Sequence, residues 1–180
     1  MIEKTIIKLK KLIKKNNLDG YIVPKNDAYF SEFAKPDRLK SISNFSGSAG
    51  YAIIFKKKNY LFVDPRYTLQ ANIESGKIFN IVEIPKFSPK DIFAISKRKL
   101  VLGFDPQLFT SFSINRNFGK KFNLVPIKQN LIDKVISSKN VEIINSFYQL
   151  NKLITGESSK SKIERLFKIL KKEKIDNIFI

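Results

Sequence analysis

Cysteine, histidine and tryptophan are all absent from this sequence of 180 residues. Without cysteine the chain has no disulfide framework, no thiolate nucleophile and no cysteine-ligated zinc or iron–sulfur cluster. Without histidine it has no imidazole metal ligand and no histidine-based catalytic triad. These absences exclude most hydrolytic chemistry for this chain.

Arginine is scarce, although the chain is strongly basic. Lysine and arginine number 34 against 16 acidic residues, a net charge of +18 that ordinarily suggests an anionic partner, but only five of the 34 are arginine. Nucleic-acid recognition favours arginine, because its planar guanidinium pairs bidentately with phosphate and guanine. Lysine, isoleucine, phenylalanine and asparagine, all encoded mainly by A/T-rich codons, make up almost half of the chain. We therefore attribute the charge to an A/T-rich genome and keep a basic nucleic-acid-binding module as an alternative function.

Long apolar runs are also missing. No stretch approaches the roughly 18 to 20 consecutive apolar residues of a membrane span, and residues 1–17 instead predict a basic amphipathic helix. The apolar face of this helix consists of Ile2, Ile6, Leu9 and Ile13. Such a stripe is typical of a helix that packs on a sheet. The sequence predicts a cytoplasmic protein without a membrane partner.

Six short apolar segments, each bounded by turn residues, are typical of β-strands. They span residues 21–23, 51–55, 60–63, 78–84, 99–103 and 122–127. The turn at residues 56–59 predicts a β-hairpin between the second and third strands. A hairpin makes at least one pair of strands antiparallel, so the sheet is expected to be mixed.

Helices are expected between these strands. Asp64-Pro65 and Ser88-Pro89 each place an N-cap residue before a proline, which is typical of a helix start. Gly76 is expected to end the first of these helices, and further helices are expected at residues 37–43 and 110–119. We predict an α/β fold with a six-stranded mixed sheet flanked by helices.

The last third of the chain predicts a second unit. The pattern is helical from Leu131 onward, and residues 155–161 are the most linker-like segment, so we expect a first domain at 1–155. Beyond it, residues 163–180 repeat residues 6–23 at an offset of 157. Residues 156–180 are therefore predicted to be a linker plus the first helix and strand of a truncated second copy of the first domain. Biased composition alone is the alternative explanation of the match.

Candidate catalytic residues have simpler structural explanations. Ser48 lacks the glycine two positions earlier that a nucleophile elbow needs, and no histidine is present to act as its base. The acidic residues show no metal-ligand spacing. Asp64 is expected to cap a helix, and Asp105 to stand in a turn. For Arg66 we expect a salt bridge, with contact to a ligand as the alternative.

Five short segments carry a family resemblance. They are residues 27–33 (DAYFSEF), 44–50 (NFSGSAG), 63–71 (VDPRYTLQA), 103–106 (GFDP) and 130–133 (NLID). In order and spacing they resemble the N-terminal domain of Xaa-Pro aminopeptidases (aminopeptidase P), in the creatinase/prolidase group. The sequence departs from that pattern at Tyr29, where relatives have His, at Pro65, where they have Gly, and after Asp133, where no Trp follows.

The resemblance implies a ribonuclease H-like mixed α/β fold. Longer members of the family carry two such non-catalytic domains ahead of a pita-bread catalytic domain. That catalytic domain holds two divalent metals, Mn, Zn or Co, through Asp, His and Glu ligands. None of it is present here, so no cofactor, catalytic residue or metal ligand is expected in this chain, which should be inactive alone.

The resemblance also implies a function. Full-length relatives release the N-terminal residue that precedes proline, and domains like this one restrict access to the cleft or support dimerisation. A companion chain carrying the rest of the peptidase, or a second copy of this chain, is the expected partner. A structural or interface role is expected at Ser31, Glu32, Phe45, Gly47, Ser48, Gly50, Asp64, Arg66, Tyr67, Gln70 and Asp105. A decayed gene fragment without function is the other alternative.

Overall fold

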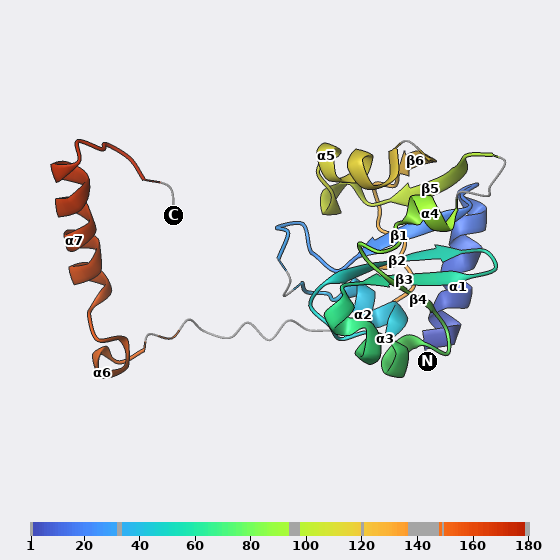
Figure 1. Cartoon of the computed structure of the whole chain (residues 1–180), viewed down its shortest axis with the longest axis horizontal. Helices are drawn as coiled ribbons and strands as arrows, with labels where there is room; N and C mark the ends of the chain where they lie inside the picture. Colours follow the sequence, from blue (N-terminus) through green and yellow to red (C-terminus); the bar gives the residue numbers. More distant parts are fainter. Residues whose placement is uncertain are drawn as a thin grey trace. The chain divides into compact units, whose positions relative to one another are not determined.

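Six strands form one mixed sheet, as the sequence predicts, in the order β4-β3-β2-β1-β5-β6 (Figure 1). The computed structural model describes residues 2–31, 34–93, 98–119, 121–136, 148 and 150–178. The strands are β1 (Gly20–Pro24), β2 (Gly50–Phe55), β3 (Asn59–Val63), β4 (Asn80–Glu83), β5 (Leu100–Phe104) and β6 (Phe122–Pro126). β1, β2 and β3 pair antiparallel, which confirms the hairpin, whereas β3–β4, β1–β5 and β5–β6 pair parallel.

The central strand β1 is buried along its whole length. Because side chains alternate across a strand, Tyr21 and Val23 belong to one apolar core, while Ile22 belongs to the other. The long helix α1 (Ile2–Lys15) covers the first core with its apolar stripe, whose residues Ile6, Leu9 and Ile13 are buried. The two cores place the sheet between two layers, as an α/β fold requires.

Short helices connect the strands and confirm most of the predicted starts. They are α2 (Arg38–Ser43), the 3₁₀ turn η1 (Pro65–Tyr67), α3 (Thr68–Ser75), α4 (Pro89–Ile92), the 3₁₀ turn η2 (Pro106–Leu108), α5 (Ser111–Ile114) and the π turn η3 (Asn115–Gly119). Asp64 caps η1 by accepting a hydrogen bond from the Arg66 N–H. Asp91 accepts hydrogen bonds from the N–H and the hydroxyl of Ser88 at the start of α4. α3 ends at Gly76 as predicted, although the φ of −61° there is right-handed.

Residues 131–136 form turns, so the predicted helix from Leu131 is wrong for this segment. Asn130 explains the difference, because its side chain accepts a hydrogen bond from the Ile132 N–H at 2.9 Å and donates one to the buried Asp105 carboxylate at 2.8 Å. Local side-chain bonds of this kind compete with helix formation. Asp133 also pairs bidentately with Arg38, at 2.8 Å for both bonds. These contacts fasten the segment to the end of the sheet.

The chain divides into two compact units, Met1–Lys139 and Asn140–Ile180. The second contains α6 (Lys152–Thr155) and α7 (Ser159–Lys172), joined across part of the segment predicted as a linker. Glu157 holds this connection by accepting hydrogen bonds from the Ser161 hydroxyl at 2.7 Å and from Arg165 at 2.9 Å. Of the strand expected at residues 178–180, residues 179 and 180 lie outside the described part of the chain.

α7 repeats the geometry of α1 at the offset found in the sequence. Both helices have 14 residues, and their bounds differ by 157 positions at each end. Each is followed by a left-handed residue with a φ of 55°, Asn17 in one case and Lys174 in the other. The next amide then donates to a carbonyl five positions earlier, Leu18 to Ile13 at 3.1 Å and Ile175 to Leu170 at 2.9 Å. The backbone of the two segments therefore ends in the same capping motif.

We predict that Asn130→Ala destabilises the first unit, because it leaves the buried Asp105 carboxylate without its amide partner. The expected loss in the free energy of unfolding is about 1–3 kcal/mol, measured by urea denaturation of the full chain. Asn123→Ala, at an exposed position of β6, is the matched control and should change the value by less than about 0.5 kcal/mol. Equal effects of the two substitutions would contradict the role assigned to Asn130.

Candidate functional site

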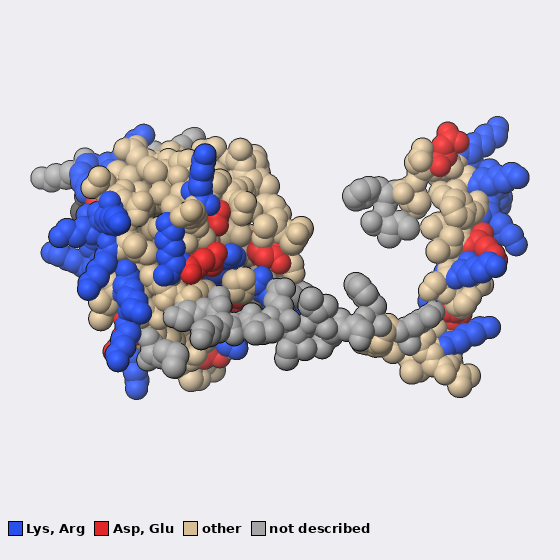
Figure 2. Space-filling view, turned by 180° about the vertical axis from the view of Figure 1, so that it is seen from behind, with Lys and Arg blue, Asp and Glu red and all other residues tan. Residues whose placement is uncertain are grey.

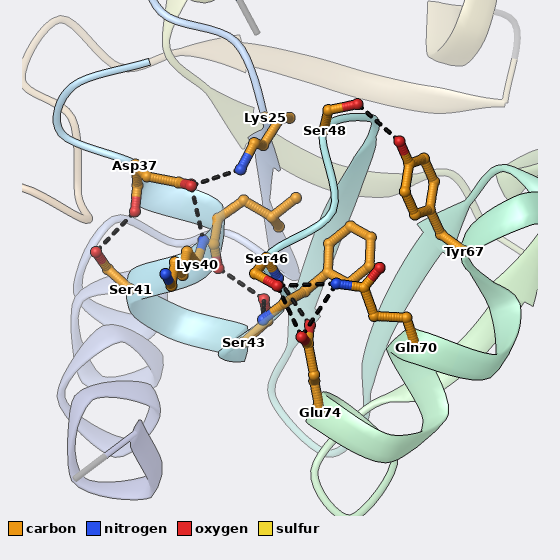
Figure 3. Close-up of polar contacts among 12 residues, drawn as sticks. Lys25, Asp37, Lys40, Ser41, Ser43, Ser46, Ser48, Tyr67, Gln70 and Glu74 are labelled. Atoms are coloured by element: carbon orange, nitrogen blue, oxygen red, sulfur yellow. Dashed lines mark hydrogen bonds and ion pairs between the residues drawn. The ribbon is translucent and has the colours of Figure 1, made fainter. Parts of the chain in front are cut away.

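The loop before β2 and the helix α3 bring several of the predicted site residues together (Figure 3). The Glu74 carboxylate accepts hydrogen bonds from the backbone N–H of Ser46 at 2.8 Å and from its hydroxyl at 2.7 Å. The Gln70 amide donates to the Ser46 hydroxyl at 2.8 Å and to Glu74 at 3.1 Å. Glu74 and Gln70 thus clamp the start of the loop to one face of α3.

A second contact fixes the middle of the same loop. The hydroxyls of Ser48 and Tyr67 lie 2.8 Å apart, within hydrogen-bond distance. The Tyr67 ring meets the buried Phe45 ring edge to face, with centroids 5.9 Å apart. A Cβ at Gly47 would lie 2.2 Å from the Phe45 ring, so only glycine fits there. The loop is rigid because small residues let it lie directly on an aromatic side chain.

At Gly50 the backbone conformation itself requires glycine. Its φ of +150° is a conformation that side-chain-bearing residues rarely adopt, and a Cβ there would lie 2.7 Å from the Phe62 carbonyl oxygen. The glycine therefore lets the chain turn from the loop into β2 at close range to β3. We refer to residues 46–50 together with α3 as the loop–α3 face.

Asp64 and Arg66 form a salt bridge at the start of this helix, as the sequence predicts. The Arg66 Nε donates to the Asp64 carboxylate at 2.8 Å. Hydrogen bonds from the Arg66 side chain and backbone N–H lower the pKa of Asp64. Both residues are solvent-accessible, and the guanidinium lies 5.9 Å from the centre of the Tyr67 ring. A surface pair of this kind contributes little to stability, so its main effect is to orient charged groups.

The remaining predicted residues lie elsewhere. The Ser31 N–H donates to the Asp27 carboxylate at 2.9 Å, in the loop after β1. Asp105 is buried and caps η2 while it accepts from Asn130. Glu32 lies outside the described residues. The structure therefore separates a structural position, Asp105, from the surface positions of the loop–α3 face.

Sequence analysis missed Ser46 and Glu74, which make the central contact of this face. The available signal was the spacing of Gln70 and Glu74, four residues apart and thus on one face of a helix. Burial raises the pKa of Glu74, but the hydrogen bonds from Ser46 and Gln70 outweigh it, so the pKa is lowered overall. The carboxylate therefore remains ionised at neutral pH and holds the loop in its charged form.

The printed contacts of this face hold the loop and α3 together. Within the described ranges, no three His, Cys, Asp or Glu side chains gather closely enough to hold a metal ion. Leu69 and Ile73, one turn apart on α3, are 75% and 78% exposed. Exposed apolar side chains beside a rigid polar loop are typical of a protein interface.

Basic side chains gather on another part of the first unit. Figure 2 shows lysine and arginine on the side where α1 lies. The exposed lysines there include Lys4, Lys8, Lys11, Lys14 and Lys15 of α1. In the part of the chain that the structure describes, no helix is long and apolar enough to cross a membrane.

Comparisons with known proteins agree with the fold. The model of the creatinase/prolidase N-terminal domain family matches residues 6–135. Probable Xaa-Pro aminopeptidase P of Coprinopsis cinerea is 32% identical over 95% of this chain and 29% of its own length. Xaa-Pro aminopeptidase 1 of Dictyostelium discoideum is 34% identical over 97% of this chain and 31% of its own length. The chain thus spans less than a third of these relatives.

Comparisons with solved structures also agree with the fold. X-prolyl aminopeptidase of Caenorhabditis elegans, described as a cytosolic enzyme with a di-nuclear active site, superposes on 98% of this chain and 32% of its own, with 26% identity and a TM-score of 0.71. The N-terminal domain of the peptidase PepQ from Mycobacterium tuberculosis covers 73% of this chain and 98% of its own, with a TM-score of 0.57 at 20% identity. The second match shows the fold of the first unit.

We predict that protonation of Glu74 releases the loop. Because the pKa of this carboxyl is lowered in the folded chain, the clamp is complete at neutral pH and is lost as the pH falls through that lowered pKa. In an NMR titration the Ser46 amide proton should therefore shift with a midpoint below the ordinary range for glutamate. Glu74→Gln should abolish this titration, and a Ser46 midpoint unchanged by that substitution would contradict the assignment.

Proposed function

The chain belongs to the creatinase/prolidase N-terminal domain family, and we propose that it acts as the non-catalytic N-terminal part of an Xaa-Pro aminopeptidase. The observation that supports this proposal is the structure of the loop–α3 face. Its motif residues hold a rigid loop beside exposed apolar side chains, and the described part of the chain contains no metal-binding cluster. The named relatives are aminopeptidases more than three times as long as this chain.

In this proposal the reaction takes place on residues outside this 180-residue chain. The relatives' name implies release of the N-terminal residue that precedes proline. A di-nuclear metal centre of Mn, Zn or Co would supply that chemistry, but the described residues do not fit such a centre. This chain contributes no group to the reacting atoms. We place the protein in the cytoplasm, as for the relative from Caenorhabditis elegans.

The proposed role of the loop–α3 face is to dock against the catalytic part and narrow the entrance to its cleft. Glu74 and Gln70 fix the backbone at Ser46, so the loop loses little freedom when it binds. A preorganised surface binds more tightly because less conformational entropy is lost. Leu69 and Ile73 would supply the apolar area of the contact. The same face could alternatively support a homodimer.

For the second unit we propose the start of a second copy of the fold, completed by a companion polypeptide. α7 has the length and capping geometry of α1, but its apolar face is less covered. Ile163 is 52% exposed, whereas its counterpart Ile6 is 4% exposed. In the first unit, the strand that follows α1 has one antiparallel and one parallel neighbour. The companion would supply both neighbours to the segment after α7.

We predict that purified 1–180 does not cleave an Xaa-Pro peptide. With Mn²⁺ or Zn²⁺ added, release of the N-terminal residue should stay at the level of a buffer control, because the chain offers no metal site within its described residues. Tagged 1–180 purified from its native cells should bring down a companion. Mass spectrometry should identify this companion as carrying Asp, His and Glu metal ligands, and its presence should restore cleavage. Metal-dependent cleavage by 1–180 alone would contradict the proposal. Lack of any detectable protein in those cells would favour a decayed gene fragment.

Hydrogen exchange should separate the two equivalent helices. We predict that amides of α7 exchange roughly 100-fold faster than those of α1 in the 180-residue chain, since a 14-residue helix with little tertiary cover is marginal and α7 buries only Leu170. The companion should slow exchange in α7. Ile163→Asp should prevent this protection, whereas Lys168→Asp, on the exposed polar face of the same helix, should leave it. Protection of α7 equal to that of α1 without a companion would refute the proposed incomplete unit.

A further inference from the structure

A pocket of about 300 Å³ opens at one end of the sheet in the first unit. It is lined by the end of β1, the start of β2, residues 108–110 after β5 and the α5–η3 segment. The residues that line it include Asn26, Phe30, Tyr51, Phe109, Asn117 and Phe118. This pocket shares only Gly50 with the loop–α3 face, and no residue of α3 lines it.

The topology of the sheet makes this position a natural binding site. β1 and β5 are parallel neighbours, and the chain leaves β1 towards β2 on one side and leaves β5 towards β6 on the other. The strand order therefore reverses between them. In open α/β sheets, ligands bind outside the carboxyl ends of the strands at such a reversal. Pro24 and Asn26, at the end of β1, line the pocket, and so do residues 108–110, which follow β5 after the turn η2.

The described lining is neutral, although the chain carries a net charge of +18. Among the described residues, no charged side chain lines the pocket. The Tyr51 ring stacks on Phe62 with centroids 4.8 Å apart, which fixes its orientation. Its hydroxyl makes no hydrogen bond to any described residue, and burial raises the pKa of Tyr51, so it keeps its proton and can donate.

Asn26 supplies a complementary acceptor. Its amide nitrogen donates to the carbonyls of Asp27 at 2.9 Å and Leu108 at 3.0 Å, which leaves the side-chain oxygen of Asn26 for another donor. A free hydroxyl donor and an amide acceptor in one pocket match the C=O and N–H groups of a peptide. The apolar rings between them match an apolar side chain.

The backbone next to the pocket has a strained conformation at Phe30, and this is a further observation in favour of a binding site. Phe30 has a φ of +60°, a left-handed conformation that is unusual for a bulky residue. The Asp27 carboxylate stabilises it by accepting hydrogen bonds from the N–H groups of Tyr29 and Ser31, both at 2.9 Å. Strain of this kind persists where surrounding contacts hold it, often at ligand-binding positions. It brings Phe30 into the lining.

We propose that this pocket binds an internal segment of a partner protein by taking in one aromatic side chain, while Tyr51 and Asn26 hydrogen-bond to the adjoining peptide groups. An internal segment is favoured over a free peptide end because the described lining residues offer no charge to a terminal ammonium or carboxylate. The inference is independent of the proposed aminopeptidase role, which rests on the loop–α3 face.

The test is an NMR titration of the ¹⁵N-labelled full chain with acetyl-Gly-Phe-Gly-amide. Saturable shifts confined to lining residues, with a millimolar dissociation constant, are expected for so small a probe. Tyr51→Phe keeps the ring stack and should weaken binding roughly three- to tenfold, the loss expected for one net hydrogen bond. Tyr60→Phe changes a tyrosine outside the lining and should leave the affinity unchanged.

Three outcomes would overturn the proposal. They are the absence of saturable shifts up to the solubility of the probe, shifts centred outside the lining, and equal or tighter binding of uncapped Gly-Phe-Gly, which carries charged ends. The amide spectrum of each variant shows whether it is folded. Because the titration involves no cleavage assay, a negative result leaves the proposed aminopeptidase role standing, and a failed cleavage prediction leaves the pocket standing.

Discussion

The complete burial of β1 is the constraint on which the rest of the first unit depends. A strand buried on both faces needs apolar cover on each side and a hydrogen-bonded neighbour on each edge. α1 covers the face of Tyr21 and Val23, and the aromatic core around Phe62 and Phe118 covers the face of Ile22. β2 and β5 supply the neighbours, one antiparallel and one parallel. The reversal of strand order beside β1 follows from this arrangement.

The sequence predicted those parts of the fold that depend on local patterns. Short apolar runs revealed all six strands, the apolar stripe revealed α1, and Asp64 before Pro65 revealed the turn at the start of α3. The error after Asn130 involves a local and a distant contact. Asn130 accepts a hydrogen bond from the Ile132 N–H and donates one to Asp105, 25 residues earlier, and no local pattern encodes the pairing with Asp105. The helical periodicity of that segment was therefore misleading.

The candidate site was predictable only in part, for the same reason. The family resemblance pointed to Ser48, Tyr67 and Gln70, but it did not include Glu74, which holds the start of the loop by contacting Ser46 across 28 positions of sequence. Much of the 44–50 motif is structural. Phe45 and Gly47 form the support on which the loop rests, and the surface presents the side chains of Ser46 and Ser48. The motif thus encodes the shape of the loop.

α1 and α7 separate the features that local sequence determines from those that depend on tertiary contacts. The two segments have the same length, the same left-handed residue after the helix and the same capping hydrogen bonds. Caps of this kind are set by the segment itself, whereas burial of an apolar stripe requires a second surface. α1 has that surface in its own sheet, so Ile6, Leu9 and Ile13 are all buried. On the corresponding face of α7, Leu170 is buried but Ile163 stays exposed. The two helices therefore share their length and capping geometry and differ in how far their apolar faces are covered.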